Sequence, residues 1–305
     1  MSARVALVFP GQGSQRVGML SDLARVEGAD RLLEGAEALS GLALRAIAQG
    51  GTPEQLADTR AAQPLLYLAD WSAGVRAIGA GLTPLALAGH SVGEFAALAV
   101  AGVFSMEAGI ELIVERSRLM ASAAADTPGG MEAVLGLDAP TIRHALDGIE
   151  GVWVANANSP SQTVISGTPA GLATATSALT DAGAKRVVRL AVAGPFHSPL
   201  MASAAERFAE VLDAAAFADA TIPVFQNTTA APATDAATIR QRLASQIVSP
   251  VRWGETMESL KSFGVTTLVE CGPGAVLTGL ARRLEGLRAY AVEDAGIDTI
   301  IEEVS

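Results

Sequence analysis

The stretch Leu85-Ala-Leu-Ala-Gly-His-Ser-Val-Gly-Glu94 predicts a buried strand over 85–88, a tight turn, and a short apolar helix over 94–101. A second apolar run, Val5–Phe9, predicts another buried strand, which leads into the glycine-rich loop 10–15. Strands and helices that alternate in this way indicate an α/β core built on a parallel sheet.

Further elements extend this pattern in both directions. Helical patterns cover 30–49, 63–80 and 105–125, and Ser105 is the predicted N-cap of the last. Toward the C-terminus we expect a helix from about 203, a strand at 222–227, helices near 239 and 255, and a strand at 265–270.

The pattern changes in the middle of the chain. Between 131 and 190 the predicted order is strand, helix, strand, strand, helix, strand, which is typical of a ferredoxin-like unit. Glycines at 129–130 and Gly194-Pro195 border this segment. The predicted fold is therefore an α/β-hydrolase-like core, residues 1–127 and 196–305, with a ferredoxin-like (βαββαβ) insert at 128–195.

The composition excludes several classes of protein. Half of the 305 residues are hydrophobic and 17% are charged, which excludes a disordered chain and a coiled-coil rod. The net charge of −11 argues against general nucleic-acid binding. One cysteine excludes a disulfide framework and a cysteine-based zinc cluster. No segment is typical of a signal peptide or a membrane span, so we expect a cytoplasmic protein. We also expect no metal site.

Gly89-His-Ser-Val-Gly93 matches the nucleophile-elbow pattern G-x-S-x-G. A strand before Ser91 and a helix after it would expose the hydroxyl beside free N–H groups at the helix start. The alternative is a tight turn that carries an ordinary surface serine. The strand–turn–helix context favours a serine nucleophile.

A serine nucleophile needs a base, and the chain has three histidines. His90 adjoins Ser91, so its side chain should point away from the hydroxyl. His144 lies on a predicted helix of the insert and is interpreted as a surface residue. His197 lies where the chain returns from the insert to the core, a common place for catalytic groups, and is the predicted base.

Arg116 lies on the apolar side of the predicted helix 105–125, between Leu112 and Leu119 on one flank and Ile113 and Met120 on the other. An arginine there is costly unless an anion meets it. It could form an internal ion pair or extend to solvent, or it could clamp the carboxylate of a substrate.

Loop 10–15 follows the first strand and should emerge at the same edge of the sheet as the elbow. It lacks the Gly-Lys-Ser/Thr ending of a phosphate loop. Its backbone N–H groups could supply a second donor to an oxyanion.

Taken together, these residues resemble the malonyl-CoA:acyl-carrier-protein transacylases and the acyltransferase domains of fatty-acid and polyketide synthases. The resemblance covers nearly the whole chain. It rests on Phe9-Pro-Gly-Gln-Gly-Ser-Gln15, Gln63-Pro64, Gly89-His-Ser-Val-Gly-Glu94, Arg116 with Met120, Asn156-Ala-Asn158, Val164-Ile-Ser-Gly167, Phe196-His197, Gln246 in Gln-Ile-Val-Ser-Pro-Val-Arg-Trp253, and Glu270-Cys-Gly-Pro-Gly-Ala-Val-Leu-Thr-Gly279.

The resemblance implies a role for each matching residue. Ser91 is acylated by malonyl-CoA, and His197 takes and returns the proton. Arg116 pairs with the malonyl carboxylate. The acyl group then passes to the phosphopantetheine thiol of a carrier protein, without a cofactor. The N–H groups of Gln12 and Val92 form the oxyanion hole, the backbone carbonyl of Gln246 orients the histidine, and the residues implied to bind substrate are Arg116, Gln246, Met120, Phe196, Asn158 and Gln63.

Selectivity and docking follow from the same resemblance. Phe before the histidine, as in Phe196-His197, is similar to the malonyl-selective class. Because carrier proteins are acidic, a chain of net charge −11 should meet one through a local basic patch. Lys185, Arg186, Arg282 and Arg283 are the candidates. We expect the protein to act as a monomer.

Three other functions remain open from the sequence. A serine hydrolase or thioesterase usually places a histidine late in the chain, and none follows His197. The transacylase subunit of a malonate decarboxylase is a nearer rival, but its elbow usually lacks a histidine at the position of His90. A non-catalytic carrier-binding protein would not need Ser91, His197 and Arg116 together.

Overall fold

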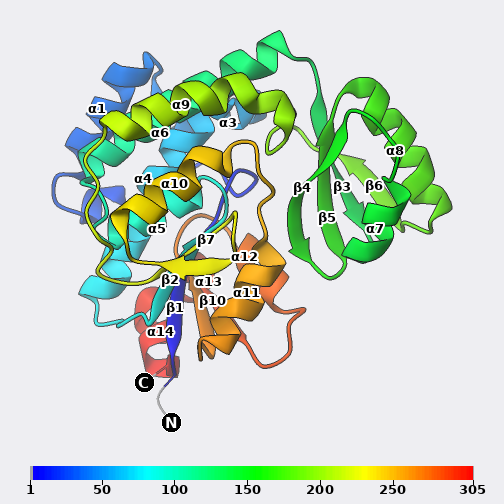
Figure 1. Cartoon of the computed structure of the whole chain (residues 1–305). Helices are drawn as coiled ribbons and strands as arrows, with labels where there is room; N and C mark the ends of the chain where they lie inside the picture. The colour runs from blue at the N-terminus through cyan, green and yellow to red at the C-terminus, as the bar shows by residue number, and fades with distance from the viewer. Residues whose placement is uncertain (1–2, 305) are drawn as a thin grey trace.

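A six-stranded sheet forms the centre of the larger part of the molecule, shown in Figure 1. The structure is a computed structural model that describes residues 3–304. Met1, Ser2 and Ser305 lie outside the described residues. The first two belong to the N-terminal segment in which the sequence predicts no signal peptide. In spatial order the strands are β10 (Arg288–Ala291), β9 (Thr267–Glu270), β1 (Val5–Phe9), β2 (Ala86–Gly89), β7 (Val224–Gln226) and β8 (Ala231–Ala233).

The first five strands of this order are parallel, and only β8 runs antiparallel to its neighbour β7. The predicted parallel sheet is confirmed. Strands β8 and β10 were not predicted, because each is a short run of three or four residues without a clear apolar pattern.

Both faces of the sheet are buried, as the alternation along β1 shows. Leu7 and Phe9 pack into the larger hydrophobic cluster, whereas Ala6 and Val8 pack into a second cluster on the opposite face. This is the two-sided burial expected of a parallel sheet covered by helices.

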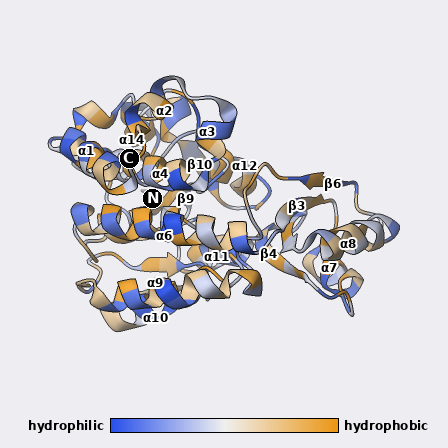
Figure 2. Ribbon diagram, turned by 90° about the horizontal axis from the view of Figure 1, so that it is seen from above, coloured by the Kyte–Doolittle hydropathy of each residue, from blue (hydrophilic) through white to orange (hydrophobic). Residues whose placement is uncertain are grey.

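Two helical layers cover these faces. Figure 2 shows that helices such as α6 and α9 are hydrophobic on one side and hydrophilic on the other. The larger cluster includes residues of α1 (Ala29–Ser40), α2 (Leu44–Gly50), α3 (Pro53–Ala57), α4 (Thr59–Gly79), α5 (Gly93–Val100), α6 (Met106–Asp126), α9 (Ala202–Ala214), α10 (Ala236–Gln246), α13 (Val292–Ala295) and α14 (Ile297–Val304), and the smaller includes α11 (Trp253–Ser262) and α12 (Val276–Ala281).

A separate four-stranded antiparallel sheet forms the insert, at the right of Figure 1. Helices α7 and α8 contribute to a hydrophobic cluster of its own. The predicted order βαββαβ is confirmed, whereas the limits 128–195 stay a prediction. The elements are β3 (Gly130–Leu135), α7 (Ala139–Ala145), β4 (Val152–Ser159), β5 (Gln162–Gly167), α8 (Pro169–Asp181) and β6 (Arg186–Arg189), with sheet order β4-β5-β3-β6.

The prediction of one helix over 30–49 is wrong. The chain forms α1 and α2 instead, separated at Gly41, whose φ of 69° places it in the left-handed region. A glycine in that conformation ends a helix by bonding back to its last turn, here through its N–H to Glu37 O. Helix α4 begins at Thr59, before the predicted 63, because the Asp58 side chain caps it.

The insert is joined to the core along strand β4. Val251 of the core forms a parallel bridge with Asn156, so Ala157 N–H donates to Val251 O at 2.9 Å and Val251 N–H donates to Ala155 O at 2.8 Å. Arg283 also donates to Ser161 Oγ at the β4–β5 turn, at 2.7 Å. One edge of the insert is therefore held beside the carboxyl ends of the core strands. Across residues 3–304, no helix is long and apolar enough to cross a membrane.

Candidate active site

Ser91 occupies a sharp turn between β2 and α5. Its φ of 54° is left-handed, a strained conformation for a residue with a side chain. The flanking glycines are required by close packing. A Cβ on Gly89 would lie 2.0 Å from Gly93 C, and a Cβ on Gly93 would lie 2.2 Å from Phe9 O. The turn thus has the geometry of a nucleophile elbow.

His197 is the histidine that meets Ser91. Its Nε2 lies 2.8 Å from Ser91 Oγ. Its Nδ1 lies 3.0 Å from Gln246 O and 3.2 Å from Ser249 O. Carbonyl oxygens only accept, so Nδ1 carries the proton and Nε2 is free to accept the serine proton. No carboxylate takes part in this arrangement within the described chain.

The environment keeps His197 uncharged. Burial lowers the pKa of its imidazole to about 3, and the nearby positive charge of Arg116 acts in the same direction. An uncharged imidazole at neutral pH is the form needed for a general base.

We therefore expect the rate of serine acylation to be insensitive to pH across the range in which an ordinary histidine titrates. The base form of His197 persists far below 6.5, so kcat/KM for the acyl donor should stay level between about pH 5 and about pH 8. The stability of the fold does depend on pH, because His197 binds a proton below about pH 6.5 in the unfolded chain and does not in the folded chain. The free energy of unfolding therefore declines as the pH falls. The acylation rate is measured per mole of folded enzyme at each pH, and an inflection in that rate near pH 6.5 would contradict the prediction.

Arg116 is fully buried behind Ser91. Its guanidinium donates to Gln63 Oε1 at 2.5 Å, to Gln246 Oε1 at 2.9 Å and to Ser91 Oγ at 3.3 Å. It also lies over the Phe95 ring, 5.4 Å from the centroid. Within residues 3–304 it forms no ion pair, and its Nε has no partner.

The protonation of Arg116 survives this burial. Desolvation lowers the pKa of the guanidinium to about 10, while the charge of Glu94 raises it. The side chain is therefore cationic at neutral pH. Its two amide partners carry no net charge, so the positive charge beside Ser91 remains available to an anionic ligand.

Gln12 and Val92, whose backbone N–H groups are the predicted oxyanion donors, both line the cavity that contains Ser91. Neither of these N–H groups donates a hydrogen bond to any described residue. The N–H of Ser91, by contrast, is occupied by Asn227 Oδ1 at 2.7 Å. Two free N–H groups beside a serine hydroxyl are what an oxyanion hole requires.

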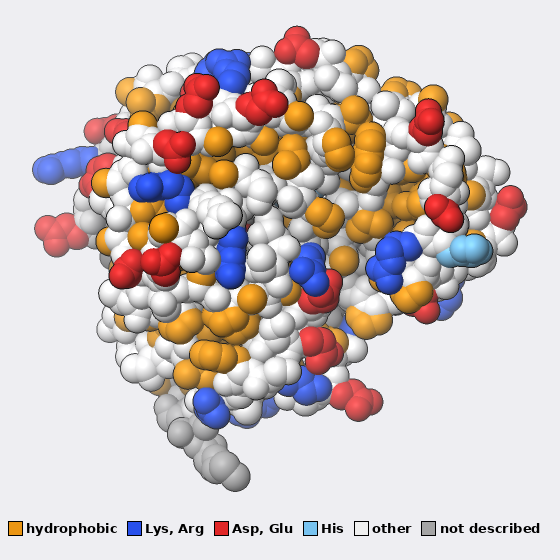
Figure 3. All heavy atoms as spheres, in the orientation of Figure 1, with side chains coloured by type: hydrophobic (Ala, Val, Ile, Leu, Met, Phe, Trp, Pro, Cys, Tyr) orange, Lys and Arg blue, Asp and Glu red, His pale blue; other side chains and the backbone are white. Residues whose placement is uncertain are grey.

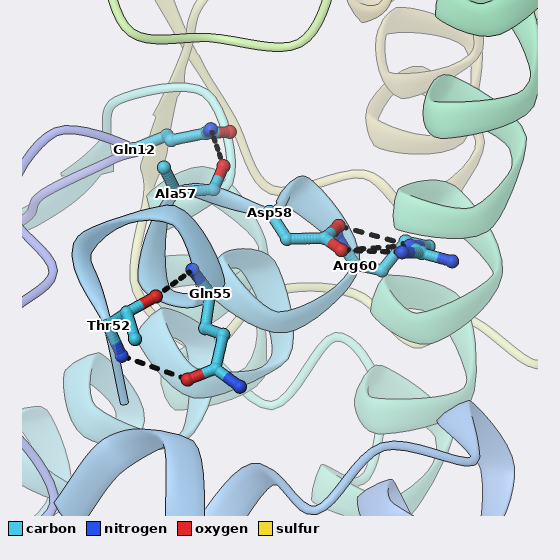
Figure 4. A network of polar contacts seen from close by, with 6 residues as sticks. All are labelled: Gln12, Thr52, Gln55, Ala57, Asp58 and Arg60. Carbon is cyan, nitrogen blue, oxygen red and sulfur yellow. Dashed lines mark hydrogen bonds and ion pairs between the residues drawn. The ribbon is translucent and has the colours of Figure 1, made fainter. Parts of the chain in front are cut away.

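The side chain of Gln12 holds its loop against the end of α3. Gln12 Nε2 donates to Ala57 O at 3.3 Å, as Figure 4 shows. Figure 4 also shows the capping box of Thr52 and Gln55 that begins α3. Thr59 Oγ1 donates to Gln12 Oε1 at 3.3 Å and accepts from Gln63 Nε2 at 2.9 Å. A chain of side-chain hydrogen bonds therefore links the glycine-rich loop to the residue that holds Arg116.

The cavity at Ser91 is small, with a volume of about 70 Å³. A cavity of about 10 to 15 Å³ already holds one water molecule, so this space suits a group of a few heavy atoms such as a short acyl group, and a larger donor must extend outside it. Its walls come from core and insert together: Gln12, Gln63, His90, Ser91, Val92, Arg116, Met120, Met131, Asn156, Leu190, Val192, Phe196 and His197.

The residues implied to bind substrate occupy different places. Met120, Phe196 and Gln63 line the cavity. Gln63 and Gln246 accept hydrogen bonds from Arg116. Asn158 is buried, and its Oδ1 lies 2.9 Å from His90 Nε2. Its contact with substrate stays a prediction.

Several neighbours of the site escaped the sequence analysis. Asn156, two positions before Asn158, is the asparagine that lines the cavity. Glu94 and Asn227 lie behind the elbow, fully or almost fully buried. Glu94 follows the elbow glycine directly, and a charged residue in an otherwise apolar helix start was the one available signal. Asn227 offered none.

The four basic residues considered for docking are exposed and lie near one end of the insert sheet. Arg186 begins β6 directly after Lys185, and it pairs with Leu135, which in turn pairs with Gln162. Arg282 and Arg283 directly follow α12, and Arg283 reaches the β4–β5 turn beside Gln162. Figure 3 shows Lys and Arg side chains scattered among acidic ones on one face, so the net charge does not exclude local basic positions. Among the described residues no group of His, Cys, Asp and Glu could hold a metal ion.

Comparisons with known proteins agree with this geometry. Residues 6–297 match the acyl transferase domain. The malonyl CoA-acyl carrier protein transacylase of Bacillus subtilis is 39% identical, over 99% of this chain and 98% of that protein. The protein of the same name from Synechocystis is 41% identical, over 92% and 93%.

Solved structures give the same result for the fold. FabD from Acinetobacter baumannii superimposes with a TM-score of 0.91 at 38% identity, covering 100% of this chain and 99% of the other. A malonyl-transacylase in complex with a type II polyketide-synthase acyl-carrier protein also has a TM-score of 0.91 at 38% identity, covering 99% and 100%.

Proposed function

This chain is an acyltransferase that belongs to the malonyl-CoA:acyl-carrier-protein transacylase family, and we propose that it works through a malonyl ester of Ser91. The malonyl group comes from malonyl-CoA and passes to the phosphopantetheine thiol of a carrier protein, for fatty-acid or polyketide synthesis. The observation that carries the proposal is the unpaired positive charge of Arg116 beside the Ser91–His197 pair.

The first half-reaction forms the ester. Ser91 Oγ attacks the thioester carbonyl while its proton moves to His197 Nε2, and the N–H groups of Gln12 and Val92 stabilise the oxyanion. As the carbon–sulfur bond breaks, the CoA sulfur takes the proton from His197. In the second half-reaction the carrier thiol gives its proton to His197 and attacks the ester, and the proton then returns to Ser91.

The choice of a malonyl group rests on size and charge. The cavity of about 70 Å³ suits a short acyl chain. A terminal carboxylate that approaches Arg116 would meet a desolvated guanidinium, where an ion pair is far stronger than in water. Phe196 and Met120 narrow the same space and would disfavour a branched acyl group.

Intact-mass spectrometry tests the covalent step. The protein is incubated with malonyl-CoA, methylmalonyl-CoA or acetyl-CoA, digested, and the modified peptide is identified. We expect the malonyl donor to give the most complete labelling, on the peptide that contains Ser91. Labelling elsewhere, or a preference for acetyl-CoA, would contradict the proposal.

A chase of the labelled protein tests transfer against hydrolysis. Adding a carrier protein with its phosphopantetheine arm should discharge the malonyl group far faster than buffer alone. Discharge at the same rate in buffer would favour a serine hydrolase instead.

The exposed basic residues at one end of the insert support a docking site for an acidic carrier protein. We expect Lys185→Glu combined with Arg186→Glu to raise KM for the carrier about tenfold, because two attractive charges become repulsive. Arg282→Glu and Arg283→Glu should act in the same direction.

Steady-state transfer at varied carrier concentration measures this effect. Arg143→Glu is the matched control, since Arg143 is an exposed arginine on α7 of the same insert. If the control raised KM as much as the test variants, docking at this end of the insert would be wrong.

We further propose that the protein acts in the cytoplasm as a monomer without a cofactor. Ser91, His197, Arg116 and both candidate oxyanion donors come from one chain, which supports a complete site in a single copy.

A further inference from the structure

The carboxylate of Glu94 lies directly behind the reactive groups and is 1% exposed. Its Oε2 accepts from the backbone N–H of Asn227 at 2.9 Å and from Gln246 Nε2 at 3.0 Å. Its Oε1 accepts from Gln226 Nε2 at 3.2 Å. Glu94 is thus a buried carboxyl group whose two oxygens accept from three N–H donors, all from outside its own helix α5.

One of these partners, Asn227, holds the elbow in place through hydrogen bonds. The side chain of Asn227 accepts from Ser91 N–H at 2.7 Å through Oδ1 and donates to Gly89 O at 2.6 Å through Nδ2. These two hydrogen bonds bracket His90 and hold both ends of the turn in which Ser91 has its left-handed φ. Because Glu94 accepts from the backbone N–H of Asn227, it positions the Asn227 side chain that bonds to Ser91 and Gly89.

The other partner orients the arginine. Gln246 Nε2 donates to Glu94 and to Ser91 O, the latter at 3.2 Å, so Gln246 Oε1 is left to accept from Arg116. If the amide were turned over, its NH₂ group would face the guanidinium, and two donors would oppose each other. The acceptor Glu94 therefore decides which way Gln246 points.

We propose that Glu94 is a positioning residue, whose buried carboxylate sets Ser91 through Asn227 and Arg116 through Gln246, so that nucleophile and carboxylate-binding group keep one relative geometry. The inference rests on the proposed function, because it takes Ser91 and Arg116 as the reacting and substrate-binding groups. It adds a residue that touches neither substrate nor the reacting atoms.

Two measurements separate the effect of Glu94 on Ser91, through Asn227, from its effect on Arg116, through Gln246. The first is the rate at which an uncharged fluorophosphonate labels Ser91, a reaction that needs the nucleophile and not Arg116. The second is the ratio of malonyl to acetyl acylation, which reports Arg116 and does not depend on how much of a variant is folded.

We expect Glu94→Ala and Glu94→Asp each to lower both readouts about tenfold, the size of effect for a lost hydrogen bond to a charged group. The aspartate keeps the charge but is too short to reach its partners. Glu94→Gln should retain most of both values, because its remaining oxygen can still accept from Asn227 and Gln246. Its NH₂ group would oppose only the Nε2 donor of Gln226, which bonds to neither Ser91 nor Arg116. Asn227→Ala should lower the labelling rate and leave the ratio unchanged.

Glu270→Ala is the matched control. Glu270 is also a buried glutamate that accepts N–H groups, from Leu277 at 3.0 Å and Thr278 at 2.7 Å, but these partners begin α12 away from the site. It should lower stability and change neither readout.

The inference is overturned if Glu94→Asp keeps both values of the parent, or if Glu94→Gln loses as much as Glu94→Asp. Absence of labelling at Ser91 in the parent would contradict the proposed function instead, so the two failures can be told apart.

Discussion

Ser91→Ala should abolish the malonyl-enzyme, and acyl transfer should fall by on the order of 10⁴-fold or more, since no other hydroxyl of residues 3–304 meets His197 and the candidate oxyanion donors. Removing the base has a smaller effect on the same step. His197→Ala leaves the serine in place without a group to take its proton, so we expect acylation to slow by about 10³- to 10⁴-fold.

Single-turnover acylation by malonyl-CoA, followed by mass spectrometry, measures both losses. Ser122→Ala and His144→Ala are matched controls, because both side chains are exposed and away from the cavity. A malonyl adduct that persisted in Ser91→Ala would refute the assignment of the nucleophile.

Arg116→Ala should lower malonyl acylation by about 100-fold while acetyl acylation changes little. An acetyl group has no carboxylate to pair with the guanidinium, so the ratio of the two rates isolates the charge interaction. Arg116→Lys should recover little of the ratio of malonyl to acetyl acylation. The guanidinium has several N–H donors in one plane and can bond to Gln63, Gln246 and a carboxylate together, whereas the ammonium of lysine lacks this planar arrangement.

Stability provides a second test of the role of Arg116. Its guanidinium is buried and hydrogen-bonded to the neutral amides of Gln63 and Gln246, while the charge of Glu94 favours its protonated form. Arg116→Met removes a desolvated charge but leaves both amide oxygens without this donor, so we expect a moderate loss of stability, about 1 to 3 kcal/mol. A large loss of stability together with an unchanged malonyl preference would assign Arg116 a structural role instead.

Local sequence patterns predicted those features of the candidate site that depend on residues close together in the chain. The elbow could be predicted because glycine spacing determines where a tight turn closes, and the packing at Gly89 and Gly93 leaves no room for a side chain. Arg116 stood out because the helical period places it among apolar residues, and it is fully buried. The order of the insert's elements followed from the same short-range periodicity.

Other features depend on contacts between distant residues. The break at Gly41 was missed because the helical period continues on both sides of it. The brace of Asn227 on Ser91 spans 136 residues, and the contact of Gln246 with Ser91 spans 155. The resemblance marked Gln246 as a site residue, but neither its neighbours in sequence nor those of Asn227 indicate a contact with the elbow.

The sequence by itself therefore determined the candidate site residues and the elements that carry them, because turn chemistry and helical or strand periods act over a few residues. Only the tertiary structure decided how these groups meet. The sheet order β10-β9-β1-β2-β7-β8 and the return of the chain from the insert bring Ser91, His197 and Arg116 to one small cavity. Burial there sets the charge states of His197 and Arg116, since desolvation depends on every element that packs around a group rather than on its neighbours in sequence.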